Sequence, residues 1–326
     1  MGLMKHHSLS RSLCLLACVA WLLFFLPAAK SELIYVSLDT AIVSYDISSG
    51  NGATIAATRT NVATGLGETM GMVFGGDGYL YATQYTANSV VRIDVSNGTK
   101  TTFATGFTNP RGITYSPVTG KYYVANSNTP GSISEVTSGG VVSTYLNSGI
   151  RAPYGISLDA SGAMYIGNNG NATLTKVVGG TPTTFATFTP GLGTRGTSVD
   201  ADGNIYTAVG NGVKKTTTTG VTSDFVASGM SFPFGMAWSS SGNLYVASYT
   251  DNKIFAYDSS GTALYNFSTG GDRPRFAAFN LEGSGFNQIQ NASVPEPGQV
   301  AASLLLLVGI GGYVAMKRRR AVQKVA

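Results

Sequence analysis

The sequence has almost no cysteine or histidine. Its 326 residues include two of each, and all four lie in the first eighteen positions, as His6, His7, Cys14 and Cys18. Removal of that stretch on export would leave a mature chain without either residue type. Such a chain has no disulfide, no Ser-His-Asp or Cys-His catalytic group, and no zinc, haem or iron–sulfur site built on these ligands. The composition therefore predicts no catalytic residues, metal ligands or cofactor of these kinds.

Charged residues are also scarce. They make up 11% of the chain, against about 25% in an ordinary globular domain. Glycine, by contrast, occurs 42 times, which suits an all-β protein with many tight turns. The formal charge of +5 comes from the two ends of the chain, because residues 32–293 contain 13 basic and 15 acidic side chains. The central region lacks the basic face that nucleic-acid binding requires, so we expect no nucleic-acid partner.

The N-terminal region has the pattern of a secretory signal peptide. An apolar run of fourteen residues, Leu13 to Leu26, follows Lys5 and Arg11 and is ended by a proline. A membrane-spanning helix needs about 20 apolar residues, whereas a signal-peptide core needs only 7–15. Small residues allow cleavage after Ser31 or after Ala29. A lipoprotein box ending at Cys18 is disfavoured, because the apolar run continues for eight residues beyond it.

The C-terminal region has three parts in a fixed order. The segment Val294, Pro295, Glu296, Pro297 precedes an apolar run over residues 300–316, and a basic cluster follows at 317–320. A helix of seventeen residues is about 25 Å long, which is just enough to cross a thin bilayer. The basic cluster would stay in the cytoplasm, so the preceding domain would face outward. These parts predict a C-terminal transmembrane helix behind a proline-rich spacer.

Together these three parts resemble the PEP-CTERM sorting signal of Gram-negative bacteria that make exopolysaccharide. In that family an exosortase, a membrane protease or transpeptidase, is thought to process the chain at the triplet. The resemblance implies recognition at Pro295, Glu296 and Pro297, and a stop-transfer role for Arg318, Arg319 and Arg320. It covers about the last 33 residues, and a plain tail anchor with an incidental triplet is the alternative.

The central region contains an internal repeat. In each unit a glycine is followed after seven or eight residues by a second glycine, and three residues later by a tyrosine. The first glycines are spaced by 41, 43, 41 and 39 residues. The five units are Gly71/Gly78/Tyr81, Gly112/Gly120/Tyr123, Gly155/Gly162/Tyr165, Gly196/Gly203/Tyr206 and Gly235/Gly242/Tyr245. Four short antiparallel strands in about 41 residues are typical of a β-propeller blade.

A sixth blade is predicted from the two ends of this region. Residues 273–280 supply only an inner strand, whereas residues 33–37 and 41–46 match the next strands of the repeat. Pairing between them would close the ring and cover an exposed sheet edge. The repeats resemble NHL-type propeller repeats. The predicted domains are a signal peptide at 1–31, a six-bladed β-propeller at 32–293, and a sorting and transmembrane segment at 294–326.

Candidate ligand-binding residues come from the position just before each repeat glycine. In a propeller these positions surround one mouth of the central channel. They alternate between arginine and an apolar or aromatic residue, as Met70, Arg111, Tyr154, Arg195, Phe234 and Arg275. Arginine pairs with carboxylates and phosphates, and aromatic rings pack on sugars, so an acidic polysaccharide would suit this mouth. Loops on the same face add Asp39, Tyr85, Asn126, Asn168, Asn169, Asn211 and Tyr249.

Several other interpretations of these residues compete with ligand binding at this mouth. In the first, each arginine simply pairs with a nearby acid, as Arg275 with Asp272, and seals the ring. Lactonase and gluconolactonase propellers hold a calcium-type ion with Glu, Asn and Asp. Here Glu68, Asp272 and the loop asparagines are candidates for such a role, although no carboxylate recurs at the channel-lining positions. Asp159 and Asp200 precede turn glycines and read as turn caps. Streptogramin-lyase-like propellers rely on histidine, which the mature chain would lack, and the repeat tyrosines read as core between blades.

The sequence therefore predicts an exported propeller at the cell envelope or surface that acts as a non-catalytic binding module. Its partners would be an exosortase-type enzyme, the membrane through the C-terminal helix, and an acidic polysaccharide. After processing, the propeller would stay attached to the membrane or be released to the cell surface. A calcium-dependent lactonase-type hydrolase is the alternative from another functional class.

Overall fold

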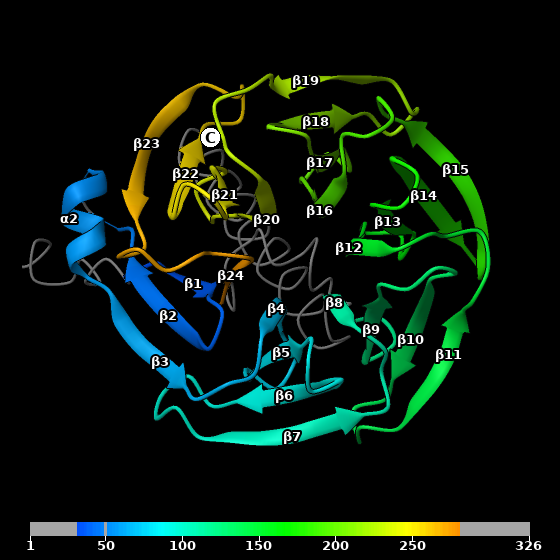
Figure 1. Ribbon diagram of the computed structural model, residues 1–326, viewed down its shortest axis with the longest axis horizontal. Helices are drawn as coiled ribbons and strands as arrows, with labels where there is room; N and C mark the ends of the chain where they lie inside the picture. The colour runs from blue at the N-terminus through cyan, green and yellow to red at the C-terminus, as the bar shows by residue number, and fades with distance from the viewer. Residues whose placement is uncertain (1–30, 49–50, 281–326) are drawn as a thin grey trace, which may run out of the picture.

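The computed structural model describes residues 31–48 and 51–280. These residues form six four-stranded antiparallel sheets arranged as blades around a central axis (Figure 1). The innermost strands of the blades are β24, β4, β8, β12, β16 and β20, and the chain runs outward through each blade in turn. The predicted six-bladed, all-β propeller is therefore confirmed.

The blades follow the chain in order. Blade 1 contains β24 (Ala277–Phe279), β1 (Leu33–Ser37), β2 (Ala41–Asp46) and β3 (Thr60–Thr64). Blade 2 contains β4 (Thr69–Phe74), β5 (Leu80–Gln84), β6 (Ser89–Ile93) and β7 (Lys100–Thr105). Blade 3 contains β8 (Pro110–Ser116), β9 (Lys121–Asn126), β10 (Ser132–Val136) and β11 (Val142–Leu146). Blade 4 contains β12 (Pro153–Leu158), β13 (Met164–Asn168), β14 (Thr173–Val178) and β15 (Thr181–Thr187). Blade 5 contains β16 (Thr194–Val199), β17 (Ile205–Val209), β18 (Gly212–Thr216) and β19 (Thr222–Val226). Blade 6 contains β20 (Pro233–Trp238), β21 (Leu244–Ser248), β22 (Lys253–Tyr257) and β23 (Ala263–Ser268).

Blade 1 closes the ring by joining distant parts of the chain. Strand β24 pairs with β1 in antiparallel register, with Ile34 opposite Phe279 and Val36 opposite Ala277. The amide of Ser37 donates to the carbonyl of Phe276 at 2.9 Å, and its hydroxyl donates to the carbonyl of Met70 in blade 2 at 2.8 Å. The closure predicted from the sequence is confirmed, and it covers a sheet edge that would otherwise be exposed.

The first glycine of each repeat lies where neighbouring inner strands almost touch. A Cβ on Gly71 would come within 2.5 Å of the Arg111 carbonyl oxygen on the next blade. A Cβ on Gly112 would overlap the carbonyl of Tyr154, and one on Gly196 that of Phe234. The glycine is therefore required by the packing of one blade against the next, and no other residue type fits without moving backbone.

The repeat tyrosines lie between blades, as predicted. Tyr81, Tyr123, Tyr165, Tyr206 and Tyr245 are all buried. The hydroxyl of Tyr165 donates to Asp159, and that of Tyr206 donates to Asp200. Both aspartates also accept backbone amides of their own turns. The reading of Asp159 and Asp200 as turn-capping residues is confirmed.

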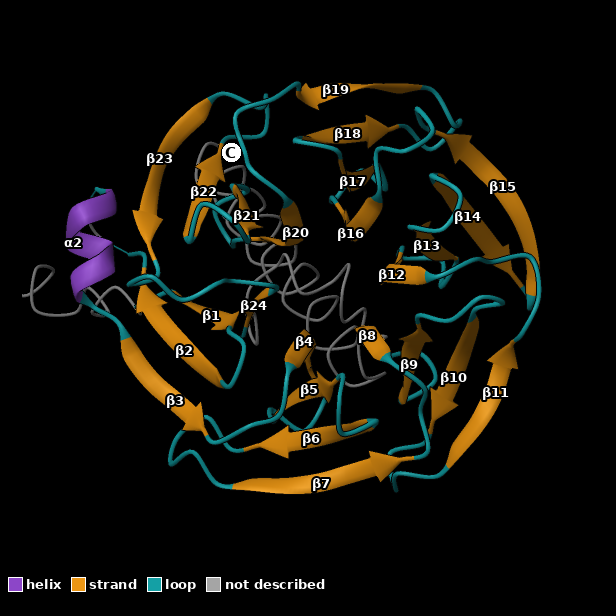
Figure 2. Ribbon diagram, viewed as in Figure 1, coloured by secondary structure: helices purple, strands orange, loops and turns teal. Residues whose placement is uncertain are grey.

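One helix was not predicted. Helix α2 (Gly52–Ala57) follows β2 and precedes β3 in the chain, and it lies on the outside of the ring (Figure 2). Asn51 caps it by accepting amides from Ala53 and Thr54. Its buried residue Ile55 packs in the core cluster that contains Phe267. The helix therefore adds cover over the outer strand β23 at the junction of blades 1 and 6.

Several predictions fall outside the described residues. They are the signal segment, the triplet Pro295, Glu296 and Pro297, the apolar run after it, and the arginine cluster. Within the described ranges, the structure has no helix that is long and apolar enough to cross a membrane.

The close approach of the inner strands predicts the effect of a single methyl group. The change Gly196→Ala would place a Cβ 2.7 Å from the Cα of Gly235 and against the Phe234 carbonyl, so the two strands must separate. We expect a loss of about 3 kcal/mol in the free energy of unfolding, measured by urea denaturation. The control is Gly139→Ala, whose Cβ meets nothing closer than 3.9 Å. Equal stability of the two variants would contradict this account.

The buried tyrosines predict a loss of stability in alkali. Burial raises the pKa of Tyr45 to about 12, so the folded protein keeps a proton that the unfolded chain releases near pH 10. This stabilisation is complete below about pH 10 and is lost as the pH rises towards 12. Urea denaturation at pH 8 and pH 11 measures it.

The variant Tyr45→Phe isolates one of these groups. The Tyr45 hydroxyl is buried without a hydrogen-bond partner in the described part of the chain. We expect this variant to gain about 1 kcal/mol at pH 8, because an unsatisfied buried hydroxyl is removed. Its stability should also fall less between pH 8 and pH 11. The matched change Tyr206→Phe removes the 3.0 Å bond to Asp200 and should lose about 1 kcal/mol at pH 8. Destabilisation by Tyr45→Phe would contradict this expectation.

Candidate functional site

The six residues before the repeat positions lie around one mouth of the channel. Met70, Phe234 and Phe276 form a buried cluster, and Tyr85, Tyr154 and Tyr249 pack against it. The ring centroid of Phe234 lies 6.0 Å from that of Tyr154 and 5.4 Å from that of Tyr249. The structure thus brings Met70, Tyr154 and Phe234 together as an apolar centre, with the three arginines in contact with its edge or with neighbouring rings.

Arg275 is held by two carboxylates. Its Nη2 lies 2.7 Å from Asp39 and 2.7 Å from Glu68, and its side chain is 8% exposed. It also contacts the sulfur of Met70. Asp272, the partner suggested by the sequence, pairs instead with Arg59. The prediction that Arg275 pairs with a nearby acid is therefore confirmed, but the predicted partner, Asp272, is wrong. Since Asp39 belongs to blade 1 and Glu68 leads into blade 2, the cluster joins the closing blade to its neighbour.

Arg111 lies between two aromatic rings. Its guanidinium carbon is 4.5 Å from the ring centroid of Tyr85 and 3.9 Å from that of Tyr154. The Nε atom is buried without a hydrogen-bond partner within residues 31–48 and 51–280. No carboxylate of these residues forms an ion pair with it. Cation–π contact therefore holds this arginine in place while its charge is not neutralised.

Arg195 is held by backbone carbonyls and an aromatic ring. It is 7% exposed, and its Nη1 donates to the backbone carbonyls of Gly210 and Pro233 at 3.2 and 3.4 Å. Its guanidinium carbon lies 3.6 Å from the ring centroid of Phe232. Among the described residues it has no carboxylate partner. Burial lowers the pKa of Arg195, which shows the cost of holding this charge away from water.

The loop residues divide into two groups. Asn126 and Asn168 are buried, and their amides bond to hydroxyls and backbone groups within their own blades. The expectation that they face the mouth as ligand-binding groups is wrong, because these bonds use them to shape the loops. Asn169, Tyr85 and Tyr249 are half-buried at the mouth, and Asn211 is exposed. Tyr249 accepts a hydrogen bond from Arg273 at 3.1 Å.

Phe232 and Arg273 were missed by the sequence reasoning. Phe232 is 42% exposed and has φ of +70°, which is unfavourable for a bulky residue. Asn109 and Ala152 also have positive φ, and all three precede the proline that begins an inner strand. The signal was present in the sequence as a repeated proline two positions before the repeat glycine, with the positive-φ residue directly before that proline. Phe232 contacts Arg195, Phe234 and Tyr249 at the mouth.

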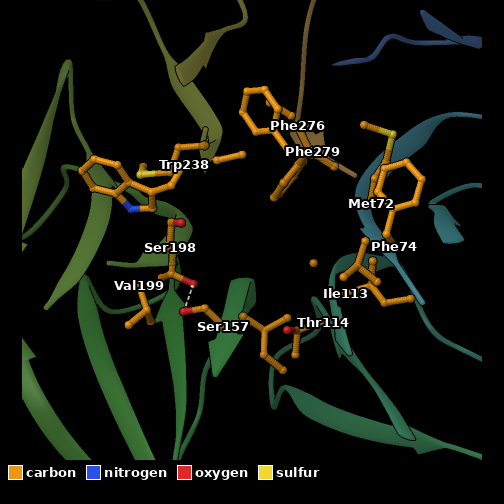
Figure 3. A pocket seen from close by; sticks show the side chains of 18 of the residues that line it. Met72, Phe74, Ile113, Thr114, Ser157, Ser198, Val199, Trp238, Phe276 and Phe279 are labelled. Carbon is orange, nitrogen blue, oxygen red and sulfur yellow. Dashed lines mark hydrogen bonds between the residues drawn. The ribbon is translucent and has the colours of Figure 1, made fainter. Parts of the chain in front are cut away.

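The channel beyond the mouth is small and is lined by both apolar and hydroxyl side chains (Figure 3). Its cavity has a volume of about 90 Å³, which is small beside the 300–1,000 Å³ of typical ligand pockets. Met72, Phe74, Trp238 and Phe279 line it, and Ser157 donates to Thr197 on the next blade at 3.2 Å. A cavity of this size leaves the mouth as the place where a larger ligand would bind.

The donor sets suggested for calcium do not come together. Glu68 pairs with Arg275, whereas Asp272 pairs with Arg59. In the part of the chain that the structure describes, no group of three or more His, Cys, Asp or Glu side chains is placed to hold a metal ion.

Solved structures support the fold assignment. The chain is a six-bladed β-propeller. It is similar to a chain in the crystal structure of a nidogen/laminin complex, with a TM-score of 0.65 and 17% identity over 76% of this chain and 98% of that chain. A streptogramin B lyase structure matches with a TM-score of 0.59 and 17% identity, over 77% of this chain and 84% of that one. At these identities the likeness shows the fold alone. No protein-family model and no curated protein matches the sequence.

A second lyase similarity includes a bound compound. The virginiamycin B lyase from Staphylococcus aureus, as a catalytically inactive histidine-to-alanine variant with quinupristin, matches with a TM-score of 0.55 and 19% identity. The match covers 76% of this chain and 86% of that chain. Propellers with binding partners and propellers with lyase activity are thus both among its structural neighbours.

The cluster around Arg275 predicts a stabilising role at the ring closure. The change Arg275→Met leaves Asp39 and Glu68 without their shared cation, and we expect a loss of about 2 kcal/mol in the free energy of unfolding, because the two acids stay partly hydrated. Arg59→Met is the control, since its pair with Asp272 is 31% and 50% exposed and should change stability by less than about 0.5 kcal/mol. Urea denaturation of both variants measures the difference. Equal losses would show that Arg275 has no special role.

Proposed function

We propose that the protein is an exported, non-catalytic binding module that holds an acidic polysaccharide at the mouth of its propeller. The observation that carries the proposal is the pair Arg111 and Arg195, two guanidiniums at the mouth without a carboxylate partner in the described residues. A buried charge is costly unless an opposite charge or hydrogen bonds offset it. A bound carboxylate would supply that offset for both.

The charge balance at the mouth supports an anion as the ligand. The acids Asp39 and Glu68 both pair with Arg275 and leave the other arginines unopposed. Aromatic side chains surround these arginines, and aromatic rings suit the apolar faces of sugars. The combination of a free guanidinium and a nearby ring favours an acidic sugar over a neutral one and over a simple inorganic ion.

The proposed location depends on the two ends of the sequence. A signal peptide over residues 1–31 would export the chain. The segment from Val294 to Pro297, the apolar run and Arg318 to Arg320 would anchor it through the membrane and present it to an exosortase-type enzyme. An acidic exopolysaccharide is a ligand that a protein so placed would meet.

Two enzymatic alternatives have less support. A calcium-dependent lactonase would need Glu68 and Asp272 near one ion, but they pair with different arginines. A lyase of the kind found among the structural neighbours is inactive after a histidine-to-alanine change, whereas this chain has histidine only at positions 6 and 7.

The proposal predicts selective binding of acidic sugar polymers. Full-length protein in detergent should bind oligogalacturonate and not dextran in isothermal titration, and binding should weaken as salt is raised. The double variant Arg111→Met/Arg195→Met should lose at least about tenfold in affinity, since each guanidinium supplies a charge-assisted contact.

The matched control is Arg92→Met/Lys214→Met. It also removes two positive charges, but from side chains outside the mouth that pair with Asp77 and Asp224. Unchanged binding in the mouth variant with its fold intact would contradict the proposal, as would equal binding of dextran. Stoichiometric calcium binding in the same titration would favour the hydrolase.

A further inference from the structure

The ring of residues around the mouth has one gap. Two positions before each mouth residue, the six blades carry Glu68, Asn109, Ala152, Gly193, Phe232 and Arg273. Only Gly193 in this set lacks a side chain. It begins blade 5 just before β16 and is half-buried, so solvent reaches it. The missing side chain leaves room beside the Gly193 backbone, and the amide of Asn169 from blade 4 comes close to the backbone there.

Two nitrogen donors border this space. A Cβ built on Gly193 would lie 2.6 Å from Nδ2 of Asn169 and 3.4 Å from Nη2 of Arg195. The Asn169 amide comes from the β13–β14 loop of blade 4, and its one bond to the Thr194 carbonyl is long, at 3.4 Å. Donors from two neighbouring blades therefore converge where Gly193 leaves room.

Arg195 is suited to bind an anion at this place. It is 7% exposed, and its two hydrogen bonds both use Nη1. Within the described ranges no hydrogen bond involves its Nε or Nη2. The acids of the mouth do not compete for it, because Asp39 and Glu68 bind Arg275. A buried guanidinium with free donors is a strong site for a carboxylate.

Apolar side chains flank the same space. Leu192 is 43% exposed and Phe232 is 42% exposed. Leu192 lies beside Gly210, where a Cβ would be 3.4 Å from its Cδ2, and Phe232 covers the guanidinium of Arg195. Exposed apolar groups next to a charged donor fit a sugar ring that carries an acid, because its C–H face packs on them while its carboxylate reaches the donors.

We infer that Gly193, Asn169 and Arg195 form a subsite for the carboxylate of a single hexuronic acid residue. This inference rests on the proposed function and deepens it, since it assigns the specific contact to blades 4 and 5. Arg275 then serves the ring closure, and Arg111 makes a secondary contact with the polymer.

The test fills the gap and leaves the charges in place. In Gly193→Ala the new methyl meets the flexible end of Asn169, and the backbone of Gly193 is not in the left-handed region, so the fold should be kept. We expect at least about tenfold weaker binding of trigalacturonate to the full-length protein, because the carboxylate is displaced from both donors. Asn169→Ala should weaken binding by about threefold, since one neutral donor is lost.

The matched control is Gly139→Ala. It adds the same methyl at a turn between β10 and β11, on the face opposite the mouth, and should bind like the unchanged protein. Thermal unfolding of each variant checks that the fold is kept. The fully methyl-esterified trisaccharide and inorganic phosphate are the ligand controls, and neither should bind with comparable affinity.

The outcomes separate the inference from the proposed function. Normal binding by Gly193→Ala would overturn the subsite, while binding of trigalacturonate by the unchanged protein would still support an acidic-polysaccharide module. Equal binding of the methyl ester would overturn the role of the carboxylate, and equal binding of phosphate would overturn the role of the sugar. Failure of the unchanged protein to bind any acidic sugar would overturn the proposed function and the subsite together.

Discussion

Backbone contact between the inner strands of neighbouring blades is the constraint that sets the geometry of the ring. At Gly71, Gly112, Gly155 and Gly196 the Cα of one blade lies against backbone of the next, and a single added carbon would overlap it. The tyrosines and other apolar residues fill the wider spaces further out, where the blades spread apart. Because these contacts are between backbone atoms, the inner strands hold fixed positions, and the side chains just before the glycines acquire fixed places around the mouth.

This constraint gives six residues equivalent backbone positions without giving them equivalent roles. At the closure, where β24 and β1 pair although they lie at opposite ends of the described chain, Arg275 binds Asp39 and Glu68. Arg111 and Arg195 begin inner strands of blades that the chain forms without interruption, and there the carbonyls and aromatic rings of adjacent loops hold them. Of the three mouth arginines, only the one at the closure has an ion pair among the described residues, and the charges of Arg111 and Arg195 stay available.

The fold could be predicted because its cause is local and repeated. The spacing of glycine and tyrosine records the same contacts in five blades, so blade number and ring closure followed from the sequence. The mouth was predictable only in part. In the sequence Asn126 and Asn168 look like exposed loop residues. In the structure they are 3% and 0% exposed, because their amides donate to hydroxyls on the next strand. The partner of Arg275 was misassigned because Asp39 is 236 residues away along the chain. Helix α2 escaped notice since six residues carry too little periodicity.

The unpaired state of Arg195 has a structural consequence for the mouth. Its two carbonyl acceptors come from different blades, Gly210 from blade 5 and Pro233 from blade 6, so the guanidinium bridges them much as Arg275 bridges blades 1 and 2. Carbonyls are neutral, however, and they hold the guanidinium without cancelling its charge. The Phe232 ring above it restricts water on one side, which strengthens the attraction to an anion approaching from the other. The same contacts that fix Arg195 between two blades therefore keep it both ordered and electrostatically unsatisfied, and these are the two conditions under which a binding site loses least on taking up a charged ligand.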